Sequence, residues 1–473
     1  MKQLCVYLLL VCAASTVRAQ IGKVVMDSSI VSSNDTIPYT IGSIILTGNK
    51  KTKNYIVLRE VTIREGQTFS SSNLAKQLEL TREQVMNTAL FVDVAVSVSA
   101  NKNNLAEVKI ALKERWYLFP LPYFKLVDRN FNQWWSEQKA SLDRVNYGLK
   151  FFYNNVSGRN DKVSLDLVNG YNQQIAFGYT QPFADKSLTK GFGINFNYSR
   201  QRELNYNTID DKQAFYKQPD FVRETVRGSA SYTFRPDSKY RYYIRAGYAW
   251  DNVSDTILKL NPNYFPEGKT SVSYMDLGAG MQYYNVDYIP FPKKGFMYEA
   301  NISHRGLGLS KTMNQFALSF EITNAVSFTK NTFIQFHNLA MVRFPFNQPF
   351  YNQGLLGYGD AYLRGLESYV QDGSIGLLSN TTLYQKLFTY VFKNPIKTKT
   401  HDRIPFTFYL KAFGDMGYAY NKYKTPNILS NTFLHTTGIG LDVVSIYDFV
   451  FRLEYSFNQK GEQGPAFRTR GDF

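Results

Sequence analysis

The sequence predicts an all-β transmembrane barrel of sixteen antiparallel strands, preceded by one small α+β domain. Aromatic residues make up 16% of the chain, yet the mean hydropathy is only −0.32. This combination is typical of strands whose side chains alternate between lipid and water. From Tyr117 onward, apolar and polar residues do alternate with a period of two. A soluble array of β-sandwiches would share the composition, so the fold class rests on the strand pattern.

The chain begins with the features of a secretory signal peptide at residues 1–19. Lys2 precedes a short apolar run at 4–11, and small residues lead to an expected cleavage after Ala19. Cys5 and Cys12 are the two cysteines of the chain, and both would be removed; lipid modification at Cys12 is a less favoured alternative. The mature protein would be exported without a disulfide or a thiolate metal site. Residues 20–39 are polar and predict a flexible leader.

Residues 40–116 predict a compact domain with the order β-α-α-β-β. The pattern favours a strand at 39–47, a short helix at 52–60 and strands at 93–100 and 105–113. Between them, Ser70 or Ser71 begins a second helix. One face of that helix carries Leu74, Leu78, Val85 and Ala89.

Five short motifs in this domain resemble a POTRA domain, the periplasmic module of BamA/TamA-type outer-membrane assembly barrels (the bacterial surface antigen family). They are G-N-K-K-T-K at 48–53, R-E at 59–60, E-G-Q-T-F at 65–69, N-T-A-L-F at 87–91 and E-R-W at 114–116. The resemblance implies an outer-membrane protein of a Gram-negative bacterium with this domain in the periplasm. The family's insertases carry several such domains, whereas this chain has one.

Sixteen alternating segments predict the barrel over residues 117–473. A closed barrel removes sheet edges and satisfies the backbone in lipid. Long connections at 202–220, 252–270, 346–374 and 418–433 would lie outside, and short turns such as 236–238 and 445–446 in the periplasm. The predicted strands are 117–126, 144–153, 160–170, 172–181, 191–201, 221–235, 239–251, 271–286, 295–305, 313–326, 331–345, 375–392, 404–417, 434–444, 447–457 and 464–473.

The connection at 346–374 is the main candidate site, because loops this long are usually functional. It contains Arg364, whose guanidinium group is always charged and offers a fork of donors, and Gly365, whose backbone can adopt a turn without steric cost. With Phe406, Phe408 and Leu410 facing lipid, alternation points Asp415 into the lumen, and the register of the next-to-last strand does the same for Glu454. An exposed turn with a solvated arginine, and an ordinary lumen carboxylate at Asp415, are the alternatives.

Two motifs here resemble further features of the same family. The segment L-R-G-L at 363–366 is similar to its V-R-G-F/Y loop motif, and F-G-D-M-G at 413–417 to its F-x-D-x-G strand motif. The resemblance implies that the loop folds into the lumen and that Arg364 pairs with Asp415, with Glu454 as a second candidate acid. Leu366 replaces the aromatic residue of the loop motif, which leaves aromatic packing against the wall in doubt.

The barrel seam is the second candidate feature. Pro120 and Pro122 lie in the first strand and Pro465 in the last, and proline cannot donate to a β-ladder. The prolines therefore predict either few hydrogen bonds across a seam that opens sideways, or simply the domain junction and a strand start. Phe473 resembles the terminal aromatic residue by which barrel proteins are recognised for assembly.

Catalytic motifs are absent from the sequence, so neither an enzyme nor a cofactor is predicted. The net charge of +16 is scattered among aromatic residues, which favours anionic outer-membrane lipid and lipopolysaccharide over nucleic acid as partners. The resemblance implies protein insertion or translocation, with unfolded client chains bound by the POTRA domain. A passive diffusion channel and an accessory subunit bound to other subunits of an assembly machine are the alternatives.

Overall fold

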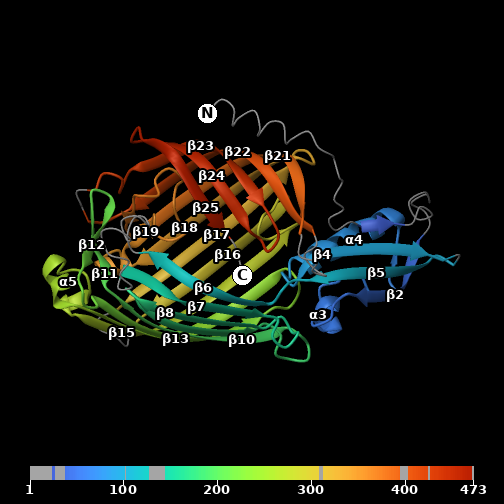
Figure 1. Ribbon diagram of the computed structural model, residues 1–473, viewed down its shortest axis with the longest axis horizontal. Helices are drawn as coiled ribbons and strands as arrows, with labels where there is room; N and C mark the ends of the chain where they lie inside the picture. The colour runs from blue at the N-terminus through green and yellow to red at the C-terminus, as the bar shows by residue number, and fades with distance from the viewer. Residues whose placement is uncertain are drawn as a thin grey trace.

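The computed structural model consists of a small α+β domain at one end of a large β-barrel (Figure 1), which confirms the predicted fold class. The signal peptide, residues 20–23 and 27–37 of the leader, and Phe473 lie outside the described part of the chain, so their roles stay predictions. The structure describes residues 24–26, 38–101, 103–126, 144–307, 313–394, 403–423 and 427–470.

The α+β domain has the predicted order of elements. Its strands and helices are β2 (Tyr39–Thr47), α3 (Asn54–Leu58), α4 (Ser71–Met86), β4 (Phe91–Ala100) and β5 (Leu105–Glu114). Leu74, Leu78 and Val85 of α4 are fully buried against the sheet. The prediction for Ala89 is wrong: the helix ends at Met86, and Ala89 is exposed with a φ of 59°.

Two short strands extend this sheet beyond the prediction. β1 (Val24–Met26) pairs in parallel with β4, and β3 (Thr68–Phe69) pairs with β2, giving the order β1-β4-β5-β2-β3. The prediction of a flexible leader is therefore wrong for residues 24–26. Val24 and Met26 pack against the domain core, and this apolar contact offsets the entropy lost on ordering three residues.

All sixteen predicted barrel strands are present in one antiparallel sheet. Consecutive strands pair throughout, apart from two hairpins that lie outside the sheet. The strands are β6 (Leu118–Leu126), β7 (Val145–Asn154), β8 (Lys162–Gly170), β9 (Gln173–Gln181), β10 (Lys190–Gln201), β13 (Arg223–Phe234), β14 (Tyr240–Val253), β15 (Ser271–Val286), β16 (Gly295–Arg305), β17 (Gln315–Ser327), β18 (Thr332–Phe344), β21 (Ile375–Lys393), β22 (Arg403–Tyr420), β23 (Phe433–Val444), β24 (Val450–Asn458) and β25 (Gln463–Arg470).

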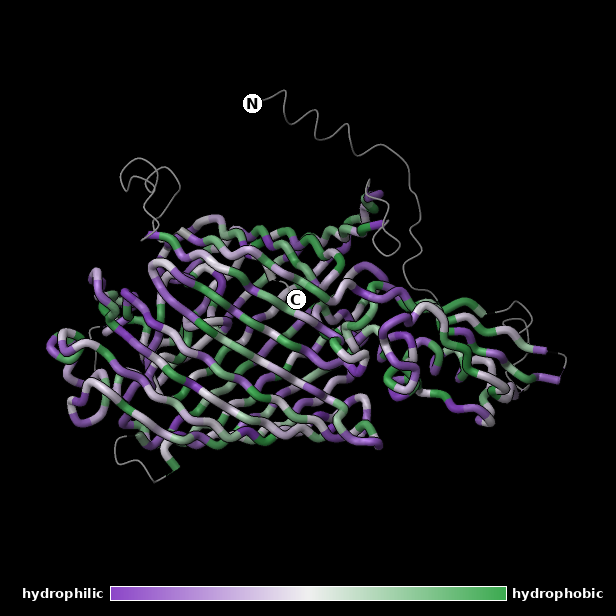
Figure 2. Tube along the Cα trace, turned by 60° about the horizontal axis from the view of Figure 1, so that its bottom comes forward, coloured by the Kyte–Doolittle hydropathy of each residue, from purple (hydrophilic) through white to green (hydrophobic). Residues whose placement is uncertain are grey.

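The outer face of the sheet is apolar and exposed, as a lipid-facing wall requires. Ile194 in β10, Phe320 in β17 and Leu410 in β22 are between 44% and 50% exposed. Their sequence neighbours point to the opposite face, and Figure 2 shows the resulting alternation of hydrophobic and hydrophilic residues along the tilted strands. Within the described residues, no helix is long and apolar enough to cross a membrane.

The long outer connections contain elements that were not predicted. A hairpin of β11 (Glu203–Ile209) and β12 (Lys212–Lys217) rises between β10 and β13. The β14–β15 connection contains α5 (Asp255–Leu260) and η4 (Pro266–Gly268). The β18–β21 connection contains η5 (Phe350–Asn352), β19 (Gly354–Leu356) and β20 (Gln371–Asp372). Segments of seven residues or fewer give too little periodicity to predict from sequence.

The α+β domain is fastened to the short turns at one end of the barrel. The Arg59 guanidinium donates to the carbonyl oxygens of Leu188 and Arg235, at 2.7 Å each, and Glu60 pairs with Arg235 at 2.8 Å. Burial, followed by the nearby charge of Arg235, lowers the pKa of Arg59. On another turn, Lys294 pairs with Glu83 of α4 at 2.7 Å. The short turns therefore lie on the same side as this domain.

A further contact joins the linker to the β23–β24 turn. Arg115 pairs with Asp448 at 2.8 Å, and both side chains are at most 8% exposed. Burial is the largest single effect and lowers the pKa of Arg115, but the hydrogen bonds with Asp448, the charge of Asp448 and the nearby Tyr288 together raise it. Tyr288 also donates to Asp448. The last residues before the barrel are thus held by a buried, charge-assisted contact.

Candidate functional site: the infolded loop and the barrel seam

The connection at 346–374 lies inside the barrel and packs against its wall. Its apolar side chains form a buried cluster with residues of β21, β22 and β23. Leu366, the residue that replaces the aromatic of the motif, is only 2% exposed and belongs to this cluster. The loop is thus held partly by apolar contact. The buried members are Leu355, Leu356, Leu363, Leu366, Tyr369, Leu378, Ala419, Leu429 and Leu434.

Arg364 and Asp415 lie in direct contact. The Arg364 Nε donates to Asp415 Oδ2 at 2.8 Å, its backbone N donates to the same oxygen at 2.9 Å, and Nη2 contacts Oδ1. Nη1 also donates to Thr382 Oγ1 at 2.9 Å. The guanidinium lies 4.0 Å from the centre of the Phe413 ring, so the wall supplies an aromatic partner. A bidentate pair of this kind fixes the angle of the loop as well as its position.

The backbone of Gly365 lies close to the wall. Its φ is 89°, which strains any residue with a Cβ. A Cβ at this position would lie 2.8 Å from the Cβ of Ser456. The Gly365 carbonyl oxygen accepts a hydrogen bond from Asn458 Nδ2 at 2.8 Å. Backbone conformation and proximity to β24 therefore both require glycine here.

Glu454 lies at the edge of the pair rather than within it. Its Oε1 is 4.0 Å from Arg364 Nη1 but accepts a hydrogen bond from Lys411 Nζ at 2.6 Å. Lys411 also pairs with Asp442 at 2.5 Å. Because Lys411, Asp442 and Glu454 are all at most 2% exposed, leaving any one of these charges without a partner would be costly. Glu454 thus joins the Arg364–Asp415 pair to a second buried ion cluster.

Arg468 of the last strand also contacts the loop. Its Nη1 donates to the Tyr362 hydroxyl at 2.6 Å, and the same nitrogen lies 3.2 Å from Glu454 Oε2. Its Nη2 contacts the Glu367 carboxylate. Neither Arg468 nor Lys411 was predicted as a site residue, although alternation from the lipid-facing Phe467 and Leu410 places both in the lumen.

The seam lies between the two strands at the ends of the sheet, β25 and β6. In the described residues each of these strands has one ladder, β25 with β24 and β6 with β7. Pro120 and Pro122 pair with Phe151 and Leu149 of β7, and Pro465 pairs with Tyr455 of β24. The structure therefore places all three prolines in the strands that border the seam.

The alternation of hydrogen-bonded and non-hydrogen-bonded pairs along each ladder shows which way these proline nitrogens face. Asn154 N donates to Tyr117 O, and Asn458 N donates to Glu462 O. Antiparallel pairs alternate between hydrogen-bonded and non-hydrogen-bonded, so Pro120, Pro122 and Pro465 occupy non-hydrogen-bonded positions of their ladders. Their nitrogens point away from β7 and β24 and toward the seam. Proline has no N–H, so three potential seam donors are missing.

The site combines a lipid-facing barrel, an infolded loop with a buried charge network and a seam poor in donors. No group of three or more His, Cys, Asp or Glu side chains in the described ranges is arranged to hold a metal ion. These features define a membrane-spanning β-barrel whose lumen is occupied by its own loop.

Comparison with known families agrees with this class. A family model described as POTRA, surface antigen variable number repeat, matches residues 39–115. A model described as the Omp85 superfamily domain matches residues 155–466. The chain belongs to the Omp85 superfamily, which confirms the family resemblance. The barrel therefore lies in the outer membrane, with the POTRA domain in the periplasm.

The chain is also similar to several solved structures. BamA from Haemophilus ducreyi lacking POTRA domains 1–3 is 17% identical, with a TM-score of 0.50 over 91% of this chain and 85% of that chain. CdiB from Acinetobacter baumannii is 12% identical (TM-score 0.46; 91% and 73% covered). CdiB from Escherichia coli is 11% identical (TM-score 0.48; 97% and 92% covered). The BamA likeness supports the fold alone. No curated protein matches the sequence.

Proposed function

We propose that this protein inserts or translocates other proteins at the outer membrane and that its lumen loop is locked in place by Arg364 and Asp415. The POTRA domain would hold an extended client chain by adding it to a sheet edge. The barrel would then pass the client on through the seam. Lipopolysaccharide and lipid surround the barrel in this proposal, and other subunits of an assembly machine are further proposed partners.

The observation that carries this proposal is the shortage of hydrogen-bond donors at the seam. The nitrogens of Pro120, Pro122 and Pro465 point toward it without a hydrogen to donate, so closing the barrel there gains fewer hydrogen bonds than closing it between other strands. Each missing bond removes about 0.5–1.5 kcal/mol of net stabilisation. Opening at this position therefore costs less than opening elsewhere in the sheet.

The proposal is tested by locking the seam. Paired cysteines in β6 and β25 are oxidised in a strain that depends on this protein, and the outer-membrane proteome is compared before and after reduction. We expect client proteins to decline under oxidation and to recover on reduction. Ala176→Cys with Asn197→Cys, across the paired strands β9 and β10, is the matched control. Unimpaired function with a locked seam would argue against lateral opening.

Conductance separates this function from a passive diffusion channel of the same fold. A lumen occupied by the locked loop should give small, flickering currents that enlarge when residues 357–369 are deleted. Large, steady currents from the intact protein would favour the passive channel. An accessory role is tested by co-purification, because an accessory subunit would remain bound to a larger assembly.

A further inference from the structure

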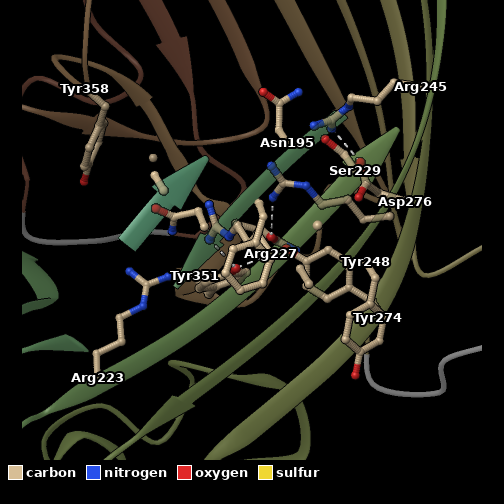
Figure 3. A pocket seen from close by; sticks show the side chains of 18 of the residues that line it. Asn195, Arg223, Arg227, Ser229, Arg245, Tyr248, Tyr274, Asp276, Tyr351 and Tyr358 are labelled. Carbon is tan, nitrogen blue, oxygen red and sulfur yellow. Dashed lines mark hydrogen bonds and ion pairs between the residues drawn. The ribbon is translucent and has the colours of Figure 1, made fainter. Parts of the chain in front are cut away.

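The lumen also contains a chamber that lies apart from the locking network, which consists of Arg364, Asp415, Glu454 and Lys411. It has a volume of about 790 Å³, within the size range of small-molecule sites. Strands β8–β10 and β13–β15 supply its floor, and residues 350–358 of the infolded loop supply its cover. Figure 3 shows its side chains converging from both sides. The chamber thus lies between the wall and the loop, away from the seam strands.

A row of small and amide residues crosses the strands of the floor, and two of its members, Asn195 and Ser229, line the chamber. Strand register places Gly178, Asn195, Ser229 and Gly247 in one row across β9, β10, β13 and β14. Asn195 is exposed although it faces the lumen, so the chamber is open to water there. The two glycines contribute no side chain, and Asn195 and Ser229 offer an amide and a hydroxyl between them.

Two half-exposed arginines flank this row. Arg227 lies one inward position before Ser229 in β13, and Arg245 one inward position before Gly247 in β14. Their side chains are 50% and 48% exposed, although Arg227 contacts Asp251 at 3.4 Å and Arg245 contacts Asp276 at 2.5 Å. Guanidinium groups have several donors, so each retains N–H groups for a ligand.

Positive charge exceeds negative charge around the chamber. Counting the lining side chains and their direct polar partners, six positive groups face four negative groups, which leaves an excess of two. The positive groups are Lys150, Arg223, Arg227, Arg245, Arg305 and Arg343, and the negative groups are Asp166, Asp251, Asp276 and Asp372. An anionic ligand would offset this excess.

The cover is aromatic. Tyr351 and Tyr358 of the loop line the chamber together with Tyr274 of β15. Their hydroxyls are fixed: Tyr351 donates to Asp251 at 2.7 Å, Tyr358 donates to Asp372 at 2.7 Å, and the Tyr274 and Tyr351 oxygens lie 3.1 Å apart. The rings are thereby held in place, and an aromatic ring provides a flat apolar surface for a ligand.

We propose that this chamber binds an acidic saccharide. Arg227 and Arg245 would take its carboxylate or phosphate group by charge-assisted hydrogen bonds, Asn195 and Ser229 its hydroxyl groups, and the tyrosine rings the apolar face of a sugar. An extended peptide fits less well, because the floor strands are already paired on both sides and offer no edge for strand addition. This inference does not depend on the proposed insertion or translocation function.

Calorimetry on the full-length protein in detergent tests the proposal with three probes: tetragalacturonic acid, uncharged maltotetraose and tetraglutamate peptide. We expect one saturable site for tetragalacturonic acid and at least tenfold weaker binding of the other two. Arg227→Gln and Arg245→Gln should each weaken tetragalacturonic acid binding about tenfold. Lys269→Gln removes an exposed outer-loop charge that does not line the chamber, and should leave binding unchanged.

A steric variant makes the test independent of the arginines. Asn195→Trp keeps every charge but fills the chamber, and should abolish binding while the barrel keeps its heat-resistant gel mobility. Lack of saturable binding to the wild type, equal affinity for maltotetraose, or binding that survives both arginine substitutions would overturn the proposal. Tighter binding of tetraglutamate would replace the saccharide with an acidic peptide.

Discussion

The two sides of the lumen use inward-facing charge in different ways. Around Arg364, on the wall of β21–β25, the loop fills the space and the acids are nearly inaccessible, with Asp415 1% and Glu454 2% exposed. Around Arg227, on the wall of β8–β15, the arginine side chains remain half exposed beside a chamber of about 790 Å³. The same strand alternation thus gives a packed ion network on one wall and a wet cationic surface on the other.

The difference arises from what the loop contributes to each wall. Toward β21–β23 it presents leucines that exclude water, so each charge there depends on its partner. Toward the chamber it presents tyrosines, of which Tyr351 donates to Asp251 of the wall, and the nearby arginine side chains stay accessible to solvent. Burial, rather than the number of charges, therefore decides which arginines hold the structure together.

Removing Arg364 should have the largest effect on stability and therefore tests the contrast between the two walls most directly. Arg364→Ala leaves Asp415 buried without its partner, and we expect a loss of about 3–5 kcal/mol in unfolding free energy. Asp415→Asn should cost a similar amount, and the double variant little more than either. Urea unfolding of the folded barrel measures all three in a double-mutant cycle. Fully additive losses would mean that the two residues do not act as a pair.

Gly365 tests how closely the loop approaches the wall. Gly365→Ala should destabilise the barrel by about 2–4 kcal/mol, from left-handed backbone strain and contact with Ser456. Gly461→Ala is the matched control, because it has a φ of 79° but no atom within 4 Å of the added Cβ. The control should show the strain alone, about 1–2 kcal/mol. Equal losses in the two variants would show that Ser456 yields to the methyl group.

The sequence alone predicted the architecture and part of the site. The sixteen strands could be predicted from the alternation of apolar and polar residues, because lipid on one side of the wall and water on the other force that alternation. Arg364, Asp415 and Glu454 were predicted as site residues from the family motifs and the strand register. Lys411 and Arg468 were missed because their importance depends on which lumen residues the loop covers. The chamber was missed for the same reason, since Arg227 and Arg245 belong to no motif and come together only through strand register.

Arg468 connects the loop to the seam, and its removal should have a moderate effect. Arg468→Gln weakens contacts with Tyr362, Glu367 and Glu454, but its side chain is 20% exposed, so water compensates in part. We expect about 1 kcal/mol in global stability. Hydrogen exchange should instead report faster opening of β25 with little change in β16. Uniform acceleration across the barrel would show that Arg468 does not act on the seam strand.

Arg227 should have the smallest effect on stability, which sharpens the contrast between the walls. Arg227→Ala removes a half-exposed ion pair at 3.4 Å, and Arg223 remains to neutralise Asp251 at the same site. Such pairs contribute about 0–1 kcal/mol, so urea unfolding should scarcely change, in contrast to Arg364→Ala. A loss as large as that of Arg364→Ala would mean that the chamber wall depends on its charges as the locking network does. The distinction between a packed and a ligand-accessible side of the lumen would then fail.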